Sequence, residues 1–259
     1  MKVLLSTLLA LLGSCGPLTA AIIEKPLEYK SGDVVCEGWQ AYDDAVAGPR
    51  PGVLVVHQWT GISDHEKAAA RKLAALGYNV LIADIYGKGV RPQPPAAGKE
   101  AGKYKGNRPL LRGRVNAALE VLSRDARTDA SKLAATGYCF GGTTVLELAR
   151  SGAALKGVVS FHGGLDSPTP ADGKNIKAQV LALHGADDPY VPAKDVAAFE
   201  AEMKAAGVDY KLVKYPGAVH SFTHKEAGTD NAKGAAYNAD ADRDSWFQMQ
   251  EFLKRVFSL

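Results

Sequence analysis

Short apolar runs and longer amphipathic segments alternate along most of this chain. The runs, such as "PGVLVVHQW" and "KAQVLALHG", are continuous, which is typical of strands buried on both faces of a parallel sheet. The segments between them are rich in alanine and leucine at helical spacing and carry capping and stop signals, as in "SDHEKAAARKLAALG". The pattern predicts strands over residues 51–59, 79–87, 131–138, 155–164, 177–185 and 209–217, and helices over 63–77, 109–125, 141–152, 192–207 and 243–257.

Strands that alternate with helices of about 10 to 15 residues predict an α/β fold with a mostly parallel sheet and helices on both faces. Residues 27–44 predict two antiparallel strands around Ser31 and Gly32, which would add an antiparallel edge. The segment over 88–107 is rich in proline, glycine and lysine and is interpreted as a loop. We expect a single domain over residues 22–259, with its chemistry at the carboxyl ends of the strands.

Composition narrows the class of protein. The 259 residues are 46% hydrophobic, which suits one large core. The net charge is only +3 and no stripe of lysine and arginine stands out, so we expect no nucleic-acid partner. We expect the protein to be a monomer.

The N-terminal segment differs in kind from the rest of the chain. Lys2 precedes an apolar run over Val3–Leu12, and small residues follow, which predicts an export signal rather than a membrane span. Cleavage near Ala20 or Ala21 is one interpretation. The other is a lipoprotein signal, "LGSC", with a lipid on Cys15. We expect an exported protein, periplasmic or extracellular, with the lipid anchor left open.

Cys139 lies in "GYCFGG", between a predicted strand and a predicted helix. The frame Gly137-x-Cys139-x-Gly141 is a nucleophile elbow with cysteine as the nucleophile, because glycines at both positions permit a very sharp turn. The N–H of Phe140, at the helix N-terminus, would stabilise a thiolate and an oxyanion. A buried cysteine in a tight turn is the alternative. Cys36, in an alternating strand, is interpreted as a buried apolar residue.

A thiolate nucleophile needs a base, and the base needs an acid to orient it. Asp188 follows a predicted strand in "HGADDPYVP" and is the better candidate for the acid, with Asp187 as the alternative. Both aspartates could instead cap the helix over 192–207. His220, in a loop after the last strand, is the candidate base. The chain order Cys139, Asp188, His220 matches the arrangement of α/β-hydrolases.

Four other histidines do not predict a metal site. Their spacing includes no pair of the H-x-x-x-H kind and no nearby cysteine partner, so we expect no metal. Three of them end predicted strands and one lies in the first helix: His57, His162, His184 and His65.

Together these motifs resemble the dienelactone hydrolase family over about residues 27–257. The resemblance is carried by "GVLVVHQWTG", "LGYNVLIADIYGKGVRP", "GYCFGGTTVLELA", "HGADDPYVP" and "HSFTHKEAG". It implies an α/β-hydrolase fold, no cofactor, and hydrolysis of lactones or small esters through a thioester on Cys139, with His220 as base and Asp188 as its partner. It also implies oxyanion donors at the N–H groups of Phe140 and Trp59.

The sequence departs from the family pattern in the substrate-binding positions. Gln58 lies where well-studied members have a glutamate that contacts the thiol, so Cys139 is expected to rest as an ion pair with His220. The family also uses arginines for a substrate carboxylate. Lys88 and His224 fall near those positions, with Arg91 close to the first, so the resemblance implies that these residues bind substrate. Solvated surface charge is the alternative for the lysine and the arginine.

Three functions therefore compete. The first is a cysteine-dependent, carboxymethylenebutenolidase-like hydrolase of small carboxylic esters or lactones. The second is an acyl-transfer or peptidase-like enzyme on the same triad. The third is a non-catalytic or thiol-redox protein on the same scaffold, since a reactive thiol outside the cytosol is open to oxidation.

Overall fold

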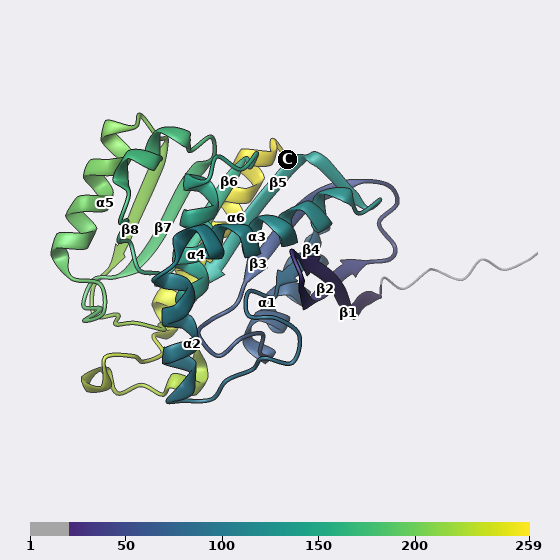
Figure 1. The fold of residues 1–259 in the computed structure, drawn as a ribbon. Coiled ribbons are helices and arrows are strands. Elements are labelled where there is room, and N and C mark those ends of the chain that lie inside the picture. The colour runs from purple at the N-terminus through teal and green to yellow at the C-terminus, as the bar shows by residue number, and fades with distance from the viewer. Residues whose placement is uncertain (1–20) are drawn as a thin grey trace, which may run out of the picture.

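A single eight-stranded sheet organises residues 21–259, which are the residues that the computed structural model describes (Figure 1). The expected export signal and Cys15 lie outside this range. The strand order is β1-β2-β4-β3-β5-β6-β7-β8. The strands are β1 (Ile22–Ser31), β2 (Val34–Asp43), β3 (Arg50–Val56), β4 (Asn79–Ala83), β5 (Thr128–Tyr138), β6 (Gly157–Phe161), β7 (Gln179–Gly185) and β8 (Tyr210–Tyr215).

Six α-helices and three short 3-10 turns lie between or after these strands within the described residues. The helices are α1 (Asp64–Ala75), α2 (Ala96–Lys105), α3 (Arg108–Arg124), α4 (Phe140–Arg150), α5 (Ala193–Ala205) and α6 (Ala239–Phe257). The 3-10 turns are η1 (Pro170–Asn175), η2 (Lys225–Ala227) and η3 (Asn231–Lys233).

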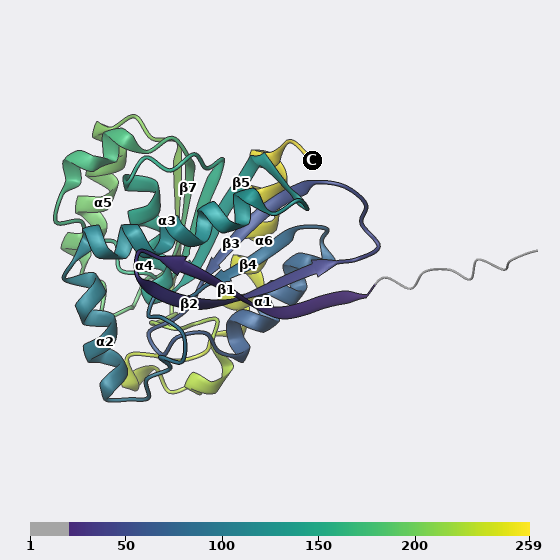
Figure 2. The same cartoon turned by 45° about the vertical axis from the view of Figure 1, so that its right-hand side comes forward.

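The sheet is antiparallel at one end and parallel elsewhere. β1 pairs with β2, and β2 with β4, in antiparallel register, whereas every neighbour from β4 to β8 is parallel. Figure 2 shows the β1–β2 hairpin at that end of the sheet. The α/β-hydrolase fold class and the antiparallel edge predicted from sequence are both confirmed.

The continuous apolar runs are explained by cores on both faces of the sheet. Along β3, Leu54 and Val56 enter one core, while Val53 and Val55 enter the other, and all four are fully buried. Helices α2 to α5 contribute to the first core, and α1 and α6 to the second. A strand covered on both sides has no solvent face, so its sequence does not alternate. Cys36 of β2 is fully buried, as its strand position predicts.

The interpretation of residues 88–107 as a loop is wrong in its second half, which forms α2. Ala97, Ala101 and Tyr104 recur at helical spacing and are buried. The glycines and lysines between them gave the segment the composition of a loop and hid this stripe. The consequence is functional, because α2 brings Lys105 to the carboxyl ends of the strands.

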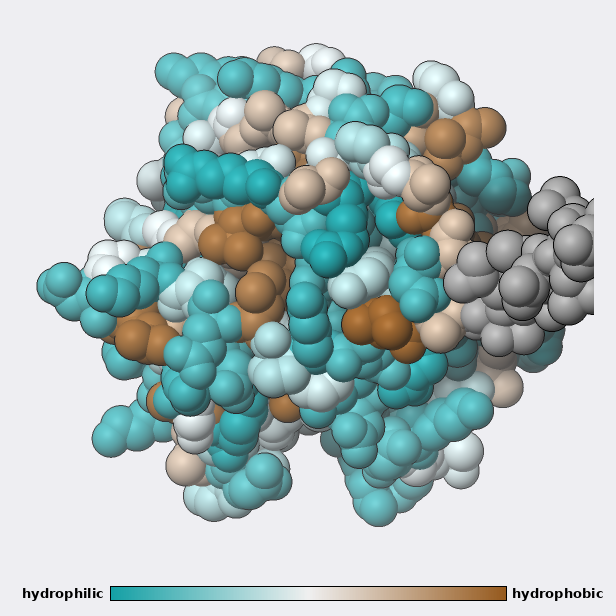
Figure 3. Space-filling model, turned by 90° about the vertical axis from the view of Figure 1, so that its right-hand side faces the viewer, coloured by the Kyte–Doolittle hydropathy of each residue, from teal (hydrophilic) through white to brown (hydrophobic). Residues whose placement is uncertain are grey.

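The surface is mainly hydrophilic on the face shown in Figure 3, where apolar residues form separate small patches. Among residues 21–259, no helix combines the length and the apolar character that crossing a bilayer would require.

Candidate active site

Cys139 occupies a strained turn between the end of β5 and the start of α4. Its backbone has φ 54° and ψ −114°, in the left-handed half of conformational space that non-glycine residues rarely adopt. The Cys139 N–H donates to the carbonyl oxygen of Phe161 at 3.0 Å and to Nδ1 of His162 at 3.1 Å. The turn therefore presents the thiol beyond the edge of the sheet, as a nucleophile elbow does.

The glycines around Cys139 are required by close backbone contacts. A Cβ atom on Gly137 would lie 2.1 Å from the carbonyl oxygen of Gly141, and one on Gly141 would lie 2.2 Å from that of Val56. Neither contact can be relieved by a side-chain rotation, because both involve main-chain atoms. The G-x-C-x-G spacing thus follows from how tightly α4 approaches β5 and β3.

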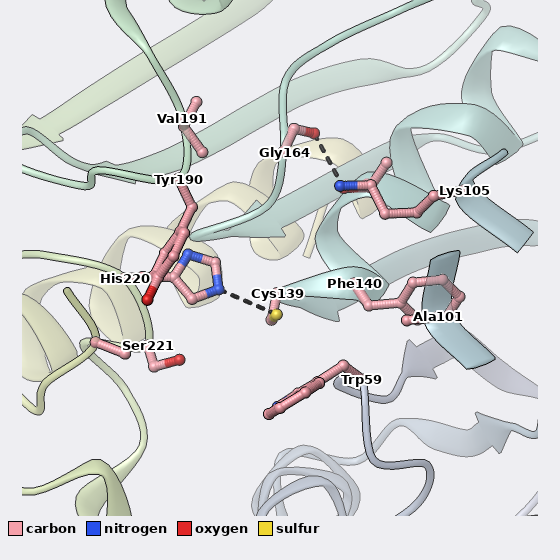
Figure 4. Close-up of a pocket in the computed structure, with 12 residues that line it drawn as sticks. Trp59, Ala101, Lys105, Cys139, Phe140, Gly164, Tyr190, Val191, His220 and Ser221 are labelled. Atoms are coloured by element: carbon pink, nitrogen blue, oxygen red, sulfur yellow. Dashed lines mark hydrogen bonds between the residues drawn. The ribbon is translucent and has the colours of Figure 1, made fainter. Parts of the chain in front are cut away.

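His220 lies between Cys139 and Asp188. Its Nε2 is 3.0 Å from Cys139 Sγ, and its Nδ1 is 2.8 Å from Asp188 Oδ2 (the contact to sulfur is drawn in Figure 4). The His220 loop is held by backbone hydrogen bonds from His220 N–H to Gly234 O and from Ala236 N–H to His220 O. The structure thus brings the three sequence-predicted residues into one hydrogen-bonded line.

The structure separates the roles of the two neighbouring aspartates. The Asp188 side chain is fully buried, and its Oδ1 accepts from the Tyr190 N–H at 2.8 Å. Asp187 instead accepts from the Gly217 N–H at 2.9 Å and so holds a turn. Helix α5 has Pro192 at its N-cap and no side-chain cap, so the capping interpretation is wrong for both aspartates.

The electrostatics of the site favour an ionised thiol. Burial raises the pKa of Cys139, but the facing His220 imidazolium and the N–H of Phe140 outweigh it, so the pKa ends below the ordinary thiol value. Burial lowers the pKa of His220, whereas the Cys139 thiolate and the Asp188 carboxylate raise it, and the balance is a pKa of about 10. Both shifts stabilise a thiolate–imidazolium pair.

A cavity of about 380 Å³ opens beside the thiol. Its walls are largely aromatic and apolar, and Lys105 is the only lysine or arginine among its lining residues (Figure 4). The cavity is lined by Trp59, Ala101, Lys105, Cys139, Phe140, Thr143, Gly164, Tyr190, Val191, His220, Ser221 and Ala235. A cavity of this size and character suits a small organic molecule.

Comparison with known proteins decides the family. The model of the dienelactone hydrolase family matches residues 37–257. The chain belongs to this family. A crystal structure of a dienelactone hydrolase-like promiscuous phosphotriesterase from metagenomic libraries is 38% identical in sequence, with a TM-score of 0.87 over 92% of this chain and 99% of that one.

Two curated relatives agree with this membership. A Saccharolobus solfataricus protein assigned as a carboxymethylenebutenolidase is 27% identical over 90% of this chain and 99% of its own length. A Bradyrhizobium protein assigned as a 2-oxo-3-(5-oxofuran-2-ylidene)propanoate lactonase is 31% identical over 68% of this chain and 75% of its own. The present chain is accordingly a hydrolase of the dienelactone hydrolase type.

The two residues predicted to supply oxyanion donors, Phe140 and Trp59, both line the cavity of this family member. The N–H of Phe140 helps to lower the pKa of the Cys139 thiol. Trp59 lines the cavity, and its backbone N–H has no hydrogen-bond partner among residues 21–259. The Trp59 backbone is held by its carbonyl, which accepts from the Tyr86 hydroxyl at 2.9 Å.

The four predicted substrate-binding residues lie outside the lining of this cavity. Gln58 and His224 contact each other, with 3.3 Å between Nε2 and Nδ1. The Lys88 ammonium pairs with the Glu28 carboxylate at the surface. Arg91 donates to the carbonyl of Val90 at 2.8 Å and lies 3.4 Å from Asp84.

Sequence reasoning missed several residues that do line the cavity, above all Lys105 and Tyr190. The buried stripe of α2 is the sequence signal that could have located Lys105. Lys105 is the last residue of this helix and directly follows the buried Tyr104. No sequence motif marks Tyr190 as a cavity residue, yet its ring packs edge-on against His220 with centroids 5.3 Å apart. Among the described residues, no group of three or more His, Cys, Asp or Glu side chains is arranged to hold a metal ion.

Proposed function

We propose that this dienelactone hydrolase family member cleaves small carboxylic esters or lactones through a thioester on Cys139. The observation that carries the proposal is the line of hydrogen bonds from Cys139 Sγ through His220 to Asp188, at 3.0 and 2.8 Å, beside a cavity of about 380 Å³. The names of the carboxymethylenebutenolidase and lactonase relatives support the substrate class.

The first half of the reaction is acylation. The Cys139 thiolate attacks the carbonyl carbon, and the carbonyl oxygen becomes an oxyanion that accepts from the N–H groups of Phe140 and Trp59. The oxyanion then collapses, the C–O bond to the leaving group breaks, and the His220 imidazolium gives its proton to the departing alkoxide. The products are the alcohol and a thioester, and in a lactone the alcohol remains tethered to the acyl chain.

The second half is hydrolysis of the thioester. Neutral His220 takes a proton from a water molecule, and the hydroxide attacks the thioester carbonyl at the same oxyanion position. The C–S bond breaks, which restores the Cys139 thiolate and the His220 imidazolium and releases the acid. Asp188 holds the imidazole so that Nε2 faces the sulfur in both halves.

Gln58 explains why this cycle starts from an ionised thiol. A glutamate at this position would contact the thiol, whereas Gln58 here contacts His224. No carboxylate at this position then repels the thiolate or takes the proton of the thiol, so His220 is the group that ionises Cys139. This agrees with the lowered pKa of Cys139 and the raised pKa of His220. We therefore propose that the site is active before substrate arrives.

The deciding experiment is pre-steady-state hydrolysis of p-nitrophenyl acetate by the reduced full chain. We expect a burst of nitrophenol and then turnover, both abolished in Cys139→Ala, with the acyl group found on Cys139 by mass spectrometry. Cys36→Ala is the matched control, because Cys36 is buried in β2 and should leave the burst unchanged. Equal turnover by Cys139→Ala and wild type would exclude the thioester mechanism.

We also propose that residues 1–21 export the protein. The support is the charged start, the apolar run and the small residues of this segment. Cell fractionation followed by intact mass of the mature protein tests this. Cleavage near Ala21 and lipidation of Cys15 give different masses, and retention of the complete chain in the cytosol would contradict export.

A further inference from the structure

A second histidine, His162, lies beside Cys139 and has no part in the reaction steps. It follows β6, is fully buried, and has φ 39°, another left-handed backbone conformation. Its ring centroid is 5.3 Å from that of His220 and 5.0 Å from that of Phe222, and both contacts are edge-on. The ring is therefore enclosed and oriented, yet it does not line the substrate cavity.

The hydrogen bonds of His162 define its protonation. Its Nδ1 lies 3.1 Å from the Cys139 backbone nitrogen, which is a donor, so Nδ1 is an acceptor and carries no proton. Its Nε2 lies 2.9 Å from Thr223 Oγ1. A ring that accepts at Nδ1 is neutral with its proton on Nε2, which donates to the threonine hydroxyl.

We infer that neutral His162 is a positioning residue, which joins the strained Cys139 backbone to the loop that carries His220. This inference rests on the proposed function in that Cys139 is taken as the nucleophile. Thr223 is three residues after His220 on the same loop. One ring thus connects the turn that presents the sulfur with the segment that presents the base.

The physical need for such a clamp comes from the strain at Cys139. A left-handed non-glycine backbone persists only where its surroundings hold it. The Cys139 N–H has two acceptors, Phe161 O at 3.0 Å and His162 Nδ1 at 3.1 Å, and together they fix the peptide plane before the nucleophile. Loss of the second acceptor would let this plane rotate and move Sγ relative to His220 Nε2.

The two adjacent imidazoles must differ in charge for this arrangement to work: His162 is neutral and His220 is positively charged. Burial lowers the pKa of His162, and the neighbouring His220 lowers it further, with smaller contributions from His65 and His224. Tyr138 and Phe222 complete the enclosure with uncharged rings. His162 therefore stays neutral while His220 carries the proton.

Two substitutions separate the two hydrogen bonds of the ring. His162→Asn places its amide oxygen near the position of Nδ1, so it can still accept from Cys139, and asparagine tolerates a left-handed backbone. His162→Gln reaches the position of Nε2 and can still contact Thr223, but it has no acceptor near Nδ1. Thr223→Val is a third variant, which leaves the backbone of residue 162 untouched and removes only the anchor of the ring.

The test measures two quantities on each full-length variant. The first is the rate at which iodoacetamide alkylates Cys139 at neutral pH without substrate, with the modified peptide identified by mass. The second is the steady-state hydrolysis of p-nitrophenyl acetate. We expect His162→Asn to stay within about twofold of wild type in both, and His162→Gln to lose roughly five- to tenfold in alkylation rate and kcat at unchanged KM. Thr223→Val should fall between them.

Equal losses in the asparagine and glutamine variants would overturn the inference, as would losses that simply follow the fall in melting temperature. The alkylation rate also separates this inference from the proposed function. If wild type fails to hydrolyse any ester but its alkylation rate still distinguishes asparagine from glutamine, the hydrolase proposal fails and the positioning role stands. If hydrolysis occurs and the two variants do not differ, the positioning role fails alone.

Discussion

At the scale of single residues, the site is defined by the charge that Cys139 and His220 share. The sulfur and Nε2 are 3.0 Å apart, and the imidazole is held from behind by a buried carboxylate. Because a thiolate and an imidazolium stabilise each other, neither residue has its ordinary pKa. The behaviour of one therefore depends on the presence of the other.

The reactive form of the pair needs Cys139 deprotonated and His220 protonated, which sets its pH range. When the pH falls below the lowered pKa of Cys139, the sulfur is protonated. When the pH rises above about 10, the pKa of His220, the imidazolium loses its proton. We expect the acid limb of Cys139 alkylation to lie below that of free cysteine, whose pKa is about 8.5. The rate should be measured against pH for wild type and His220→Ala, in which the limb returns toward the free value. An unshifted limb in wild type would contradict the ion pair.

Asp188 and Asp187 offer a matched pair of substitutions. Asp188→Asn removes the charge that orients His220, so we expect kcat for p-nitrophenyl acetate to fall at least about tenfold. Asp187→Asn keeps an oxygen for the Gly217 N–H and should change kcat by less than about twofold. A comparable loss in both variants would mean that the loop, rather than the carboxylate on His220, limits catalysis.

At the scale of elements, the site is assembled where β3, β5, β7 and β8 end. Cys139, Asp188 and His220 could be placed from sequence because each follows a short apolar run, and parallel strands bring their carboxyl ends to one edge. Lys105 could not be placed in this way. It comes from α2, whose buried stripe is interrupted by glycines, and whose position over the strand ends depends on tertiary packing. Lys88 and Arg91 were predicted to bind substrate only from the resemblance to the family. The sequence does not reveal that Lys88 pairs with Glu28 and that Arg91 lies beside Asp84, because these partners are distant in the chain or brought close only by the fold.

Lys105 should select substrates that carry a negative charge. It lines the cavity and forms no ion pair among the described residues, whereas Lys103 on the same helix pairs with Glu100 away from the cavity. We expect Lys105→Met to raise KM two- to fivefold, by about 1 kcal/mol or less, for an ester bearing a carboxylate. KM for a neutral ester should not change. Lys103→Met is the control, and an equal effect on both substrates would assign Lys105 a purely apolar role.

The close approach of α4 to β3 makes a second prediction at this scale. Gly141→Ala puts a Cβ 2.2 Å from the Val56 carbonyl oxygen, so we expect a loss of about 2 kcal/mol or more in the free energy of unfolding. Gly113→Ala, in α3, meets nothing within 4 Å and should instead gain about 0.5 to 1 kcal/mol from helix propensity. Urea unfolding of both variants measures the difference. A Gly141→Ala protein as stable as wild type would show that the turn can open.

At the scale of the whole molecule, a buried network of charges joins the helices on one face of the sheet. Arg150 of α4 is fully buried between Glu147 and Glu202, with contacts of 3.0 and 2.6 Å, and Glu147 also contacts Arg112 of α3 at 2.8 Å. Since Glu202 belongs to α5, three helices share the network. Removal of one partner leaves a buried charge uncompensated, which costs far more than the loss of a surface pair.

We therefore expect Glu202→Ala to lower the free energy of unfolding by about 3 to 5 kcal/mol. Glu200→Ala on the same helix loses only a partly exposed pair with Lys214 and should cost about 1 kcal/mol or less. Chemical denaturation gives both values, and kcat at low temperature checks that the active site is intact in the folded variant. Equal costs would show that the network is hydrated rather than dry.

The β1–β2 hairpin has a consequence for how copies of this protein behave toward one another. β1 ends the sheet, so its outer edge carries backbone groups on which the strand of another molecule could pair. Pro26 removes one donor from that strand, and the exposed Lys25, Glu28 and Lys30 set charges along it. An incoming copy would meet an incomplete ladder and charged side chains that it would have to desolvate. The element that closes the sheet thus also protects it against edge-to-edge aggregation at high concentration.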